Sequence, residues 1–287
     1  MTSTAVLVTG ATGNVGHEVV LELASARVRV RAASTDPARA RALLGSDIDI
    51  IPFAFGRPET YRAAFEGMDG LFLMRPPHVT DVRRLITPAL EVAIDAGVHQ
   101  VVFLSLQGVE RNPVVPHRSI ERALLDSGLT YTFLRASFFM QNLSTTHAAD
   151  IRERDEVFVP AGGGRTAFVD VRDLAAVAAL AFARPEHANK AYELTGSEAL
   201  TYTQVAAILS EVLGRPIRYA DPSAPRFWRR MRQRNYPAAQ VLVMIGLYTV
   251  CRLGLAGHLT DTLAKVLDRP PTTFSQFARD YASVWRR

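Results

Sequence analysis

The sequence predicts an α/β fold, a doubly wound parallel sheet with a smaller, mostly helical C-terminal lobe. Three observations predict it. Short apolar runs alternate with helical patterns through the first half of the chain, as they do in βαβ units. A glycine-rich turn at residues 10–16 joins the first apolar run to the first helical pattern. From residue 201 onward the pattern is mostly helical.

Six strands are expected in the first half of the chain, at residues 5–9, 28–33, 49–51, 70–74, 100–105 and 130–135. The helices between them are expected at residues 15–26, 37–44, 58–65, 81–96 and 115–127. Asp36 as N-cap and Pro37 at the first helical position mark where the second helix begins. Because parallel crossovers are right-handed, these units build a doubly wound sheet, and its ligands bind beyond the carboxyl ends of the strands.

Beyond residue 135 the pattern loosens. Short strands are expected at 157–160 and 168–169, a helix at 174–183, and further strands at 191–195 and 217–219. We therefore place the sheet domain at residues 1–155, with 166–196 returning to it. Residues 197–287 are expected to form a mostly helical substrate lobe.

The composition is that of a globular protein, with 48% hydrophobic and 21% charged residues among 287. The single cysteine, Cys251, excludes an intrachain disulfide and a multi-cysteine metal site. It is either a packed apolar side chain or a reactive thiol. The histidines, His78 among them, show no metal-ligand spacing, so no metal is expected. A chain without disulfides suits the reducing cytoplasm, which is the location we expect.

Two segments bear on partners. Residues 241–255 are apolar but carry Arg252 and fall short of the roughly 20 residues of a membrane span. We interpret them as a buried or interface helix, and we expect neither a signal peptide nor a membrane partner. The net charge of +5 comes largely from arginine, which is densest at 226–234. That segment is a solvated helix face, a helix closing over an anionic ligand or, least favoured, a nucleic-acid contact.

The glycine-rich turn has the sequence of a dinucleotide-binding loop. Gly10 permits the tight turn, Gly13 lets the backbone approach phosphate oxygens, and Gly16 allows the helix to pack closely on the strand. The helix N-terminus adds oriented N–H groups and partial positive charge. We predict a Rossmann unit that holds the pyrophosphate of NAD(P) through Gly10, Thr12, Gly13, Asn14, Val15 and Gly16.

The end of the second strand favours NADP(H) over NAD(H). NAD-selective sites usually place a carboxylate there to bind the ribose 2′-hydroxyl. This chain offers Ser34 and Thr35 instead, and Asp36 is expected to be a helix cap. The two hydroxyls, with Arg39 or Arg31 nearby, suit a 2′-phosphate.

In this turn and in several later segments, the chain resembles the NmrA-like branch of the atypical short-chain dehydrogenase/reductases. The likeness covers nearly the whole chain and is carried by the turn itself and by the segments at residues 71–77, 105–108, 127–135, 138–142 and 269–274. The resemblance implies NAD(P) binding and a smaller lobe that closes the substrate cleft. The family includes quinone, azo-dye and triphenylmethane-dye reductases, as well as regulators that bind the dinucleotide without known turnover.

This chain departs from the wider pattern in two places. Short-chain reductases typically use a Tyr-x-x-x-Lys pair, in which the tyrosine donates the proton. When the chain is aligned through Glu121, Pro113 stands at the tyrosine position and His117 at the lysine position. Ala54 stands where relatives often carry an aspartate that contacts adenine. Because the Tyr-x-x-x-Lys pair is absent, alcohol–ketone chemistry through a phenolate is not expected.

The ends of strands four and five supply the candidates near the nicotinamide, namely Arg75, Pro76, Ser105 and Gln107. Ser105 is expected to bind a substrate carbonyl or the nicotinamide amide, unless it only satisfies backbone. His117 and Glu121 lie four residues apart on one helix face. Ser105 and His117 are the candidate catalytic residues. We expect His117 to bind the nicotinamide ribose or to donate a proton, and Glu121 to orient the His117 ring. The alternative is an ordinary helix pair.

By the resemblance, the residues that line the substrate cleft, together with Gln107, are Phe138, Phe139, Met140 and Asn142. As a bare pattern, such an aromatic run is more often part of a core. Asp170 and Asp173 flank the start of a helix and are most simply caps.

Three functions remain open from the sequence. The first is an NAD(P)H-dependent reductase of an apolar, aromatic or quinone-like acceptor, for which the cofactor carries the chemistry and a missing tyrosine is tolerable. The second is a non-catalytic NAD(P) sensor with a protein partner, and the third is redox-neutral tailoring of a small molecule. A homodimer is compatible with each of them.

Overall fold

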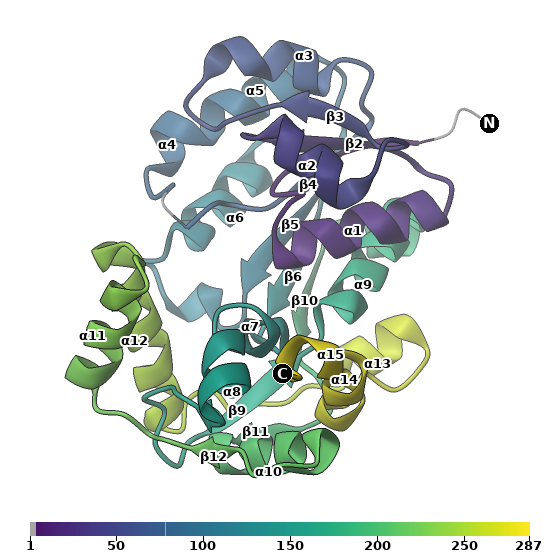
Figure 1. Ribbon diagram of the computed structural model, residues 1–287. Coiled ribbons are helices and arrows are strands. Elements are labelled where there is room, and N and C mark those ends of the chain that lie inside the picture. The colour runs from purple at the N-terminus through teal and green to yellow at the C-terminus, as the bar shows by residue number, and fades with distance from the viewer. Residues whose placement is uncertain (1–3, 78) are drawn as a thin grey trace. The chain divides into compact units, whose positions relative to one another are not determined.

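A computed structural model describes residues 4–77 and 79–287 and divides the chain into two compact units (Figure 1). Unit 1 runs to Ala136 and also contains Val171–Leu194, and unit 2 contains Ser137–Asp170 and Thr195–Arg287. The first boundary between the two units thus comes at residue 136, directly after the sixth strand, whereas the sequence predicts it at residue 155. The chain does return to the first unit, over a shorter segment than 166–196.

Unit 1 is built on a seven-stranded sheet in the order β10-β6-β5-β4-β1-β2-β3, with every neighbouring pair parallel. The strands are β1 Ala5–Val8, β2 Arg29–Ser34, β3 Asp49–Pro52, β4 Gly70–Leu73, β5 Gln100–Leu106, β6 Thr130–Ala136 and β10 Lys190–Leu194. The chain runs outward from β1 to β3 and then in the opposite direction from β4 to β10. This reversal confirms the doubly wound α/β fold and places the topological switch point between β1 and β4.

Helices cover both faces of this sheet. They are α1 Asn14–Ser25, α2 Pro37–Leu44, α3 Tyr61–Phe65, α4 Val82–Leu85, α5 Thr87–Asp95, α6 Pro116–Asp126 and α9 Val171–Ala183, with 3-10 turns at Pro58–Thr60, Val109–Arg111 and Pro185–His187. The apolar sides of α3, α4, α5 and α6 pack with strand residues such as Leu71 and Phe103 into one core.

The single helix expected at 81–96 is broken in two. Pro88 lies at the second position of α5 and cannot donate a backbone hydrogen bond, so the helix restarts there.

Unit 2 combines two small sheets with short helices. The strands are β7 Phe138–Phe139, β8 Glu156–Val157, β9 Arg165–Val169, β11 Ala199–Thr201 and β12 Arg218–Tyr219. The helices are α7 Gln141–Ser144, α8 Ala148–Arg154, α10 Tyr202–Leu213, α11 Ala224–Gln233, α12 Ala238–Arg252, α13 Thr262–Leu267, α14 Phe274–Asp280 and α15 Ala282–Trp285. The sequence analysis missed β7 and β11, because two or three residues are too few to show alternation.

Two arginines of the basic segment point into unit 2 rather than into solvent. Asp150 is fully buried and accepts hydrogen bonds from Arg230 at 3.0 Å and from Arg234 at 2.7 and 2.8 Å. Arg230 also pairs with buried Glu156 and lies 3.3 Å above the centre of the Phe158 ring. Part of the arginine cluster is therefore an internal ion network.

Cys251 is buried in the core of unit 2, and its burial raises the pKa of its thiol to about 11. Of the two interpretations of this cysteine, the packed apolar side chain is the correct one.

None of the helices that the structure describes combines the length and apolar character of a membrane span. No group of His, Cys, Asp and Glu within residues 4–77 and 79–287 is placed to hold a metal ion, and His78 lies outside those residues.

The Asp150 network predicts a stability change. Asp150→Asn removes the charge that pairs two largely buried guanidinium groups, so we expect the free energy of unfolding to fall by about 3 kcal/mol, measured by urea denaturation. Arg229→Ala removes an exposed arginine from α11, the helix of Arg230, and should change the free energy of unfolding by less than about 0.5 kcal/mol. Equal effects of the two substitutions would contradict the structural role of the network.

Candidate functional site

The turn between β1 and α1 has the geometry of an anion-binding loop. Gly10 adopts a left-handed conformation with φ +65°, and the Gly13 N–H donates to the Gly10 carbonyl at 2.9 Å. The helix then begins at Asn14, with no side-chain cap and no acidic residue in its first turn. This end of α1 therefore carries the partial positive charge of a helix N-terminus with no carboxylate in its first turn, and it suits an anion.

Two glycines of this turn disfavour a side chain, Gly16 because a backbone atom is in the way and Gly10 because of its left-handed φ, since the Met74 methyl group beside Gly10 can move. A Cβ atom on Gly16 would lie 2.2 Å from the Gly10 carbonyl oxygen, and one on Gly10 would lie 2.1 Å from the methyl carbon of Met74. Thr9 anchors the turn to β4, because its hydroxyl donates to the Phe72 carbonyl at 3.1 Å and accepts from the Met74 N–H at 2.7 Å. The close helix–strand packing predicted for Gly16 is thus present.

At the end of β2, only some of the residues predicted for a 2′-phosphate present their side chains to solvent. The Ser34 hydroxyl is buried and forms a turn with Asp36, accepting from its N–H and donating to its carbonyl, both at 3.0 Å. Arg31 binds Asp49 at 2.6 Å and donates to carbonyl groups of the α3 region. Thr35 and Arg39 are exposed. Asp36 caps α2 by accepting from the Arg39 N–H, as predicted.

At the end of β4, the Arg75 side chain holds its own loop together. One guanidinium nitrogen donates to the carbonyls of Pro76, Pro77 and Val79 at 2.8 to 3.0 Å. Its Nε is buried without a hydrogen-bond partner. Burial lowers the pKa of Arg75. Half-buried Pro76 and its neighbours are therefore positioned by Arg75.

A buried carboxylate joins the ends of β5 and β6. Glu121, on α6, is 1% exposed and accepts from the Ser105 hydroxyl at 2.7 Å. It also accepts from Arg135 at 2.9 and 3.1 Å, and these hydrogen bonds raise the pKa of Arg135. Arg135 pairs in addition with Glu110 at 3.3 Å. Glu121 therefore orients Ser105 and Arg135, and the prediction that it orients His117 is wrong.

His117 lies in the first turn of α6 with its ring stacked on Phe103, the ring centres 5.9 Å apart. Its Nδ1 is buried without a hydrogen-bond partner. Burial, and then the positive charge of Arg75, lower the pKa of His117 to about 4. The ring is a neutral hydrogen-bonding group, so the free protein does not hold the proton that the sequence analysis considered.

The remaining predicted residues are spread over both units. Gln107 follows β5, where its N–H donates to the Ala136 carbonyl at 3.0 Å. In unit 2, Met140 is buried in the core and Phe138 packs against that core. Phe139 and Asn142 are half-buried. The aromatic run therefore contributes partly to the core, and only part of it has surface left for a ligand.

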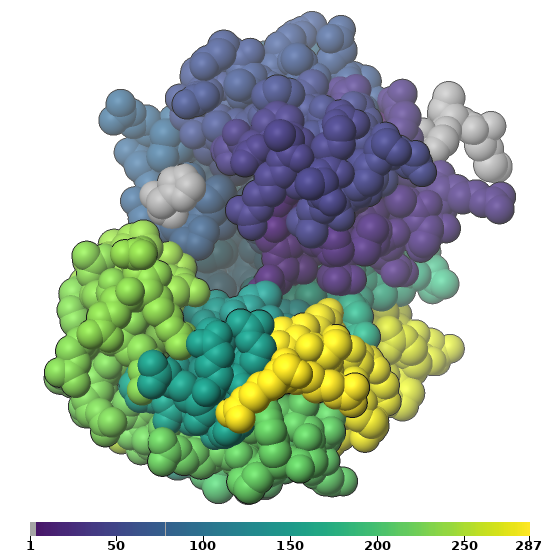
Figure 2. All heavy atoms as spheres, in the orientation of Figure 1, coloured from purple at the N-terminus to yellow at the C-terminus, as the bar shows by residue number. Residues whose placement is uncertain are grey.

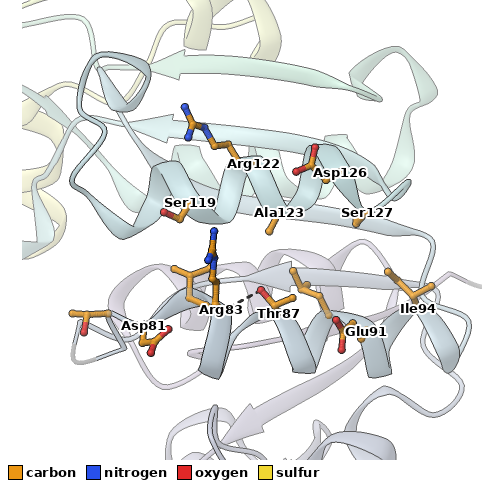
Figure 3. A pocket seen from close by; sticks show the side chains of 13 residues that line it. Asp81, Arg83, Thr87, Glu91, Ile94, Ser119, Arg122, Ala123, Asp126 and Ser127 are labelled. Carbon is orange, nitrogen blue, oxygen red and sulfur yellow. Dashed lines mark hydrogen bonds between the residues drawn. The ribbon is translucent and has the colours of Figure 1, made fainter.

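A groove of about 910 Å³ lies over α4, α5 and α6 of unit 1 (Figure 3). Arg83 and Arg122 lie towards one end of it, and Glu91 and Asp126 lie towards the other. None of the candidate site residues lines this groove. It is therefore separate from the turn that suits an anion.

The chain matches the model of the NmrA-like family over residues 2–277. It is 34% identical over 284 residues to an NAD(P)H azoreductase of Xenophilus azovorans, covering 98% of this chain and 99% of that one. It superposes on a Citrobacter sp. triphenylmethane reductase complexed with NADP(H), with a TM-score of 0.82, 25% identity, and coverage of 97% and 99%. A second structure is the NADPH-dependent quinone oxidoreductase of Escherichia coli complexed with NADPH, with a TM-score of 0.80, 27% identity, and coverage of 96% and 99%.

The low pKa of His117 is directly measurable. We expect its imidazole to stay neutral from neutral pH down to about pH 5, followed by ¹⁵N chemical shifts during a pH titration. Arg75→Met removes a positive charge that opposes protonation, so the pKa should rise yet stay below 6.5, because burial is the larger cause. Arg62→Met, on α3, is the matched control and should leave the titration unchanged. A midpoint at or above pH 6.5 in the unaltered protein would contradict this assignment.

Proposed function

The chain belongs to the NmrA-like family, and on that premise we propose that it is an NAD(P)H-dependent reductase of apolar aromatic or quinone-like acceptors. The observation that carries the proposal is the uncapped glycine turn at the switch point of the sheet, in a chain similar over 98% of its length to an azoreductase. The relatives with solved nucleotide complexes act, by their names, on a triphenylmethane and on quinones. These acceptors share extended conjugation and apolar surfaces.

The residues of the turn fit a dinucleotide. The N-terminus of α1, which begins at Asn14 and has no acidic residue in its first turn, would hold the pyrophosphate, whereas the Gly13 N–H already donates to the Gly10 carbonyl and shapes the turn. Pro76 and the loop that Arg75 holds follow the neighbouring strand β4 and would form the next wall. A bound reduced nicotinamide supplies the hydride, so the chain needs no nucleophile of its own.

NADP(H) is the cofactor form that the β2 end favours. Arg39 and Thr35 are exposed there and would bind the 2′-phosphate, whereas Ser34 and Arg31 are engaged in structural hydrogen bonds. The carboxylate of Asp36 caps α2 instead of presenting itself to a ribose hydroxyl. The Arg39 guanidinium is therefore the main determinant of the preference for NADP(H) over NAD(H).

Neutral His117 and hydrogen-bonded Ser105 narrow the substrate class. Because the Ser105 proton is donated to Glu121, its oxygen would accept from the nicotinamide amide rather than donate to a substrate carbonyl. His117 would bind the nicotinamide ribose as a neutral imidazole. Neither residue offers a strong acid at neutral pH. Acceptors that stabilise the added electron pair by conjugation, and take their proton from water, therefore fit better than simple ketones.

The preference for NADPH predicts a selective loss. Arg39→Ala should raise the dissociation constant for NADPH at least about tenfold and leave that for NADH within about twofold, measured by fluorescence titration. Arg41→Ala removes an exposed arginine from the same helix and is the control. Equal weakening of both cofactors by Arg39→Ala would contradict a 2′-phosphate contact.

Turnover is tested by following the loss of reduced-nicotinamide absorbance with a panel of quinones, azo dyes and triphenylmethane dyes. We expect oxidation of NADPH with at least one class and little with simple ketones. His117→Gln keeps a hydrogen-bonding side chain, so kcat should fall less than about tenfold, whereas loss of a general acid costs about 10²-fold or more. Tight NADPH binding without turnover on any acceptor would overturn the reductase and favour a sensor.

A further inference from the structure

One helix of unit 2 carries large apolar side chains that are exposed among the described residues. On α12, Leu242, Val243, Leu247 and Val250 have exposed fractions of 60%, 61%, 47% and 39%. At 100° per residue these positions lie on one side of the helix. The opposite side carries buried residues such as Tyr248, so α12 is apolar all round. A helix of that kind normally has a cover on both sides.

The exposed face continues past the end of α12. Leu253, Leu255 and Leu259 are exposed by 67%, 70% and 39%. Seven of the twelve large apolar side chains that are exposed in the described part of the chain therefore fall within residues 242–259. Exposed apolar side chains are thus concentrated in this segment, and exposed apolar surface mostly marks contacts with partners, membranes or ligands.

The charge around this face has one sign. Residues 222–260 contain six arginines and neither aspartate nor glutamate. Arg230 and Arg234 pair with buried acids and Arg252 pairs with Asp221 at 2.6 Å. Three others on α11 are exposed, and no acidic partner is found for them within the described residues; they are Arg226, Arg229 and Arg232. Helices α11 and α12 form a hairpin, side by side in light green in Figures 1 and 2.

We propose that the α11–α12 hairpin docks on an anionic lipid bilayer, with the leucine face of α12 entering the headgroup region. A basic helix beside exposed leucines is the combination that binds such a surface. The exposed arginines lie on the helix next to α12, so they add an attraction to anionic lipids that weakens as salt is added. At 15 residues α12 is too short to span the bilayer, so it lies in the interface.

The same charges argue against the other occupants of this face. A second copy of the chain would bring identical unpaired arginines together, which costs free energy in an interface of one sign. Nucleic acid would satisfy the arginines but leave the leucines in water. An anionic surface with an apolar interior covers both sets of side chains. The inference does not depend on the proposed redox activity and is tested without turnover.

The test is co-sedimentation of the full chain with vesicles of equal parts phosphatidylglycerol and phosphatidylcholine, and with vesicles of phosphatidylcholine alone. We expect binding to the anionic vesicles that weakens as salt is added. Leu247→Glu, and separately Arg226→Glu with Arg229→Glu, should each lower the partition coefficient at least about tenfold. Leu125→Glu on α6, and Arg41→Glu with Arg62→Glu on α2 and α3, make the same charge changes at exposed sites and should stay within about twofold.

The Tm of each variant is measured, and only variants with the Tm of the unaltered protein are compared, so that loss of folding is not counted as loss of docking. Equal binding to both vesicle types, or no binding to either, would overturn the proposal. A dimer in solution that Leu247→Glu dissociates would assign the face to a second copy. A large rise in the KM for a water-soluble quinone in Leu247→Glu, with vesicle binding unchanged, would assign the face to the substrate.

Discussion

At the carboxyl end of β1 the backbone of Gly16 lies against the carbonyl oxygen of Gly10, where a side chain would come within 2.2 Å. This close approach brings the first turn of α1 directly after β1, beside β4 and at the switch point of the sheet. Its N–H groups consequently face the edge where the ligands of such sheets bind. The dinucleotide site, and with it every functional proposal for unit 1, depends on this contact.

The chemistry open to the protein depends on how buried charges are paired around that edge. Glu121 is committed to Ser105 and Arg135, and Arg75 is committed to its own loop while its charge opposes protonation of His117. The site therefore contains hydrogen-bonding groups with fixed directions and no available strong acid. That combination suits acceptors whose conjugation stabilises the transferred electron pair, as in the dyes and quinones named for the relatives.

Unit 2 uses its arginines in two ways. On the inner side of α11, Arg230 and Arg234 neutralise Asp150 and Glu156, which would otherwise be buried charges without partners. Arg226 and Arg229 are exposed on α11, which packs with α12, and they have no acidic partner within residues 4–77 and 79–287. Arg226, Arg230 and Arg234 are spaced four residues apart, so their different roles come from the acids packed near Arg230 and Arg234 and not from the helical period. One short segment thus both stabilises the core and shapes a surface.

The sequence by itself determined the parallel sheet, the glycine turn, the Asp36 cap and the family, because these depend on local spacing and on motifs along the chain. It missed β7 and β11, which are too short to show a period. Only the tertiary structure decided the fate of the polar side chains. Ser34, Arg31 and Glu121 are engaged by residues 2 to 35 positions away, and the partners of Arg230 are farther still. Which hydroxyl or charge remains available depends on packing that no local pattern encodes, because partners in a folded chain are chosen by proximity in space.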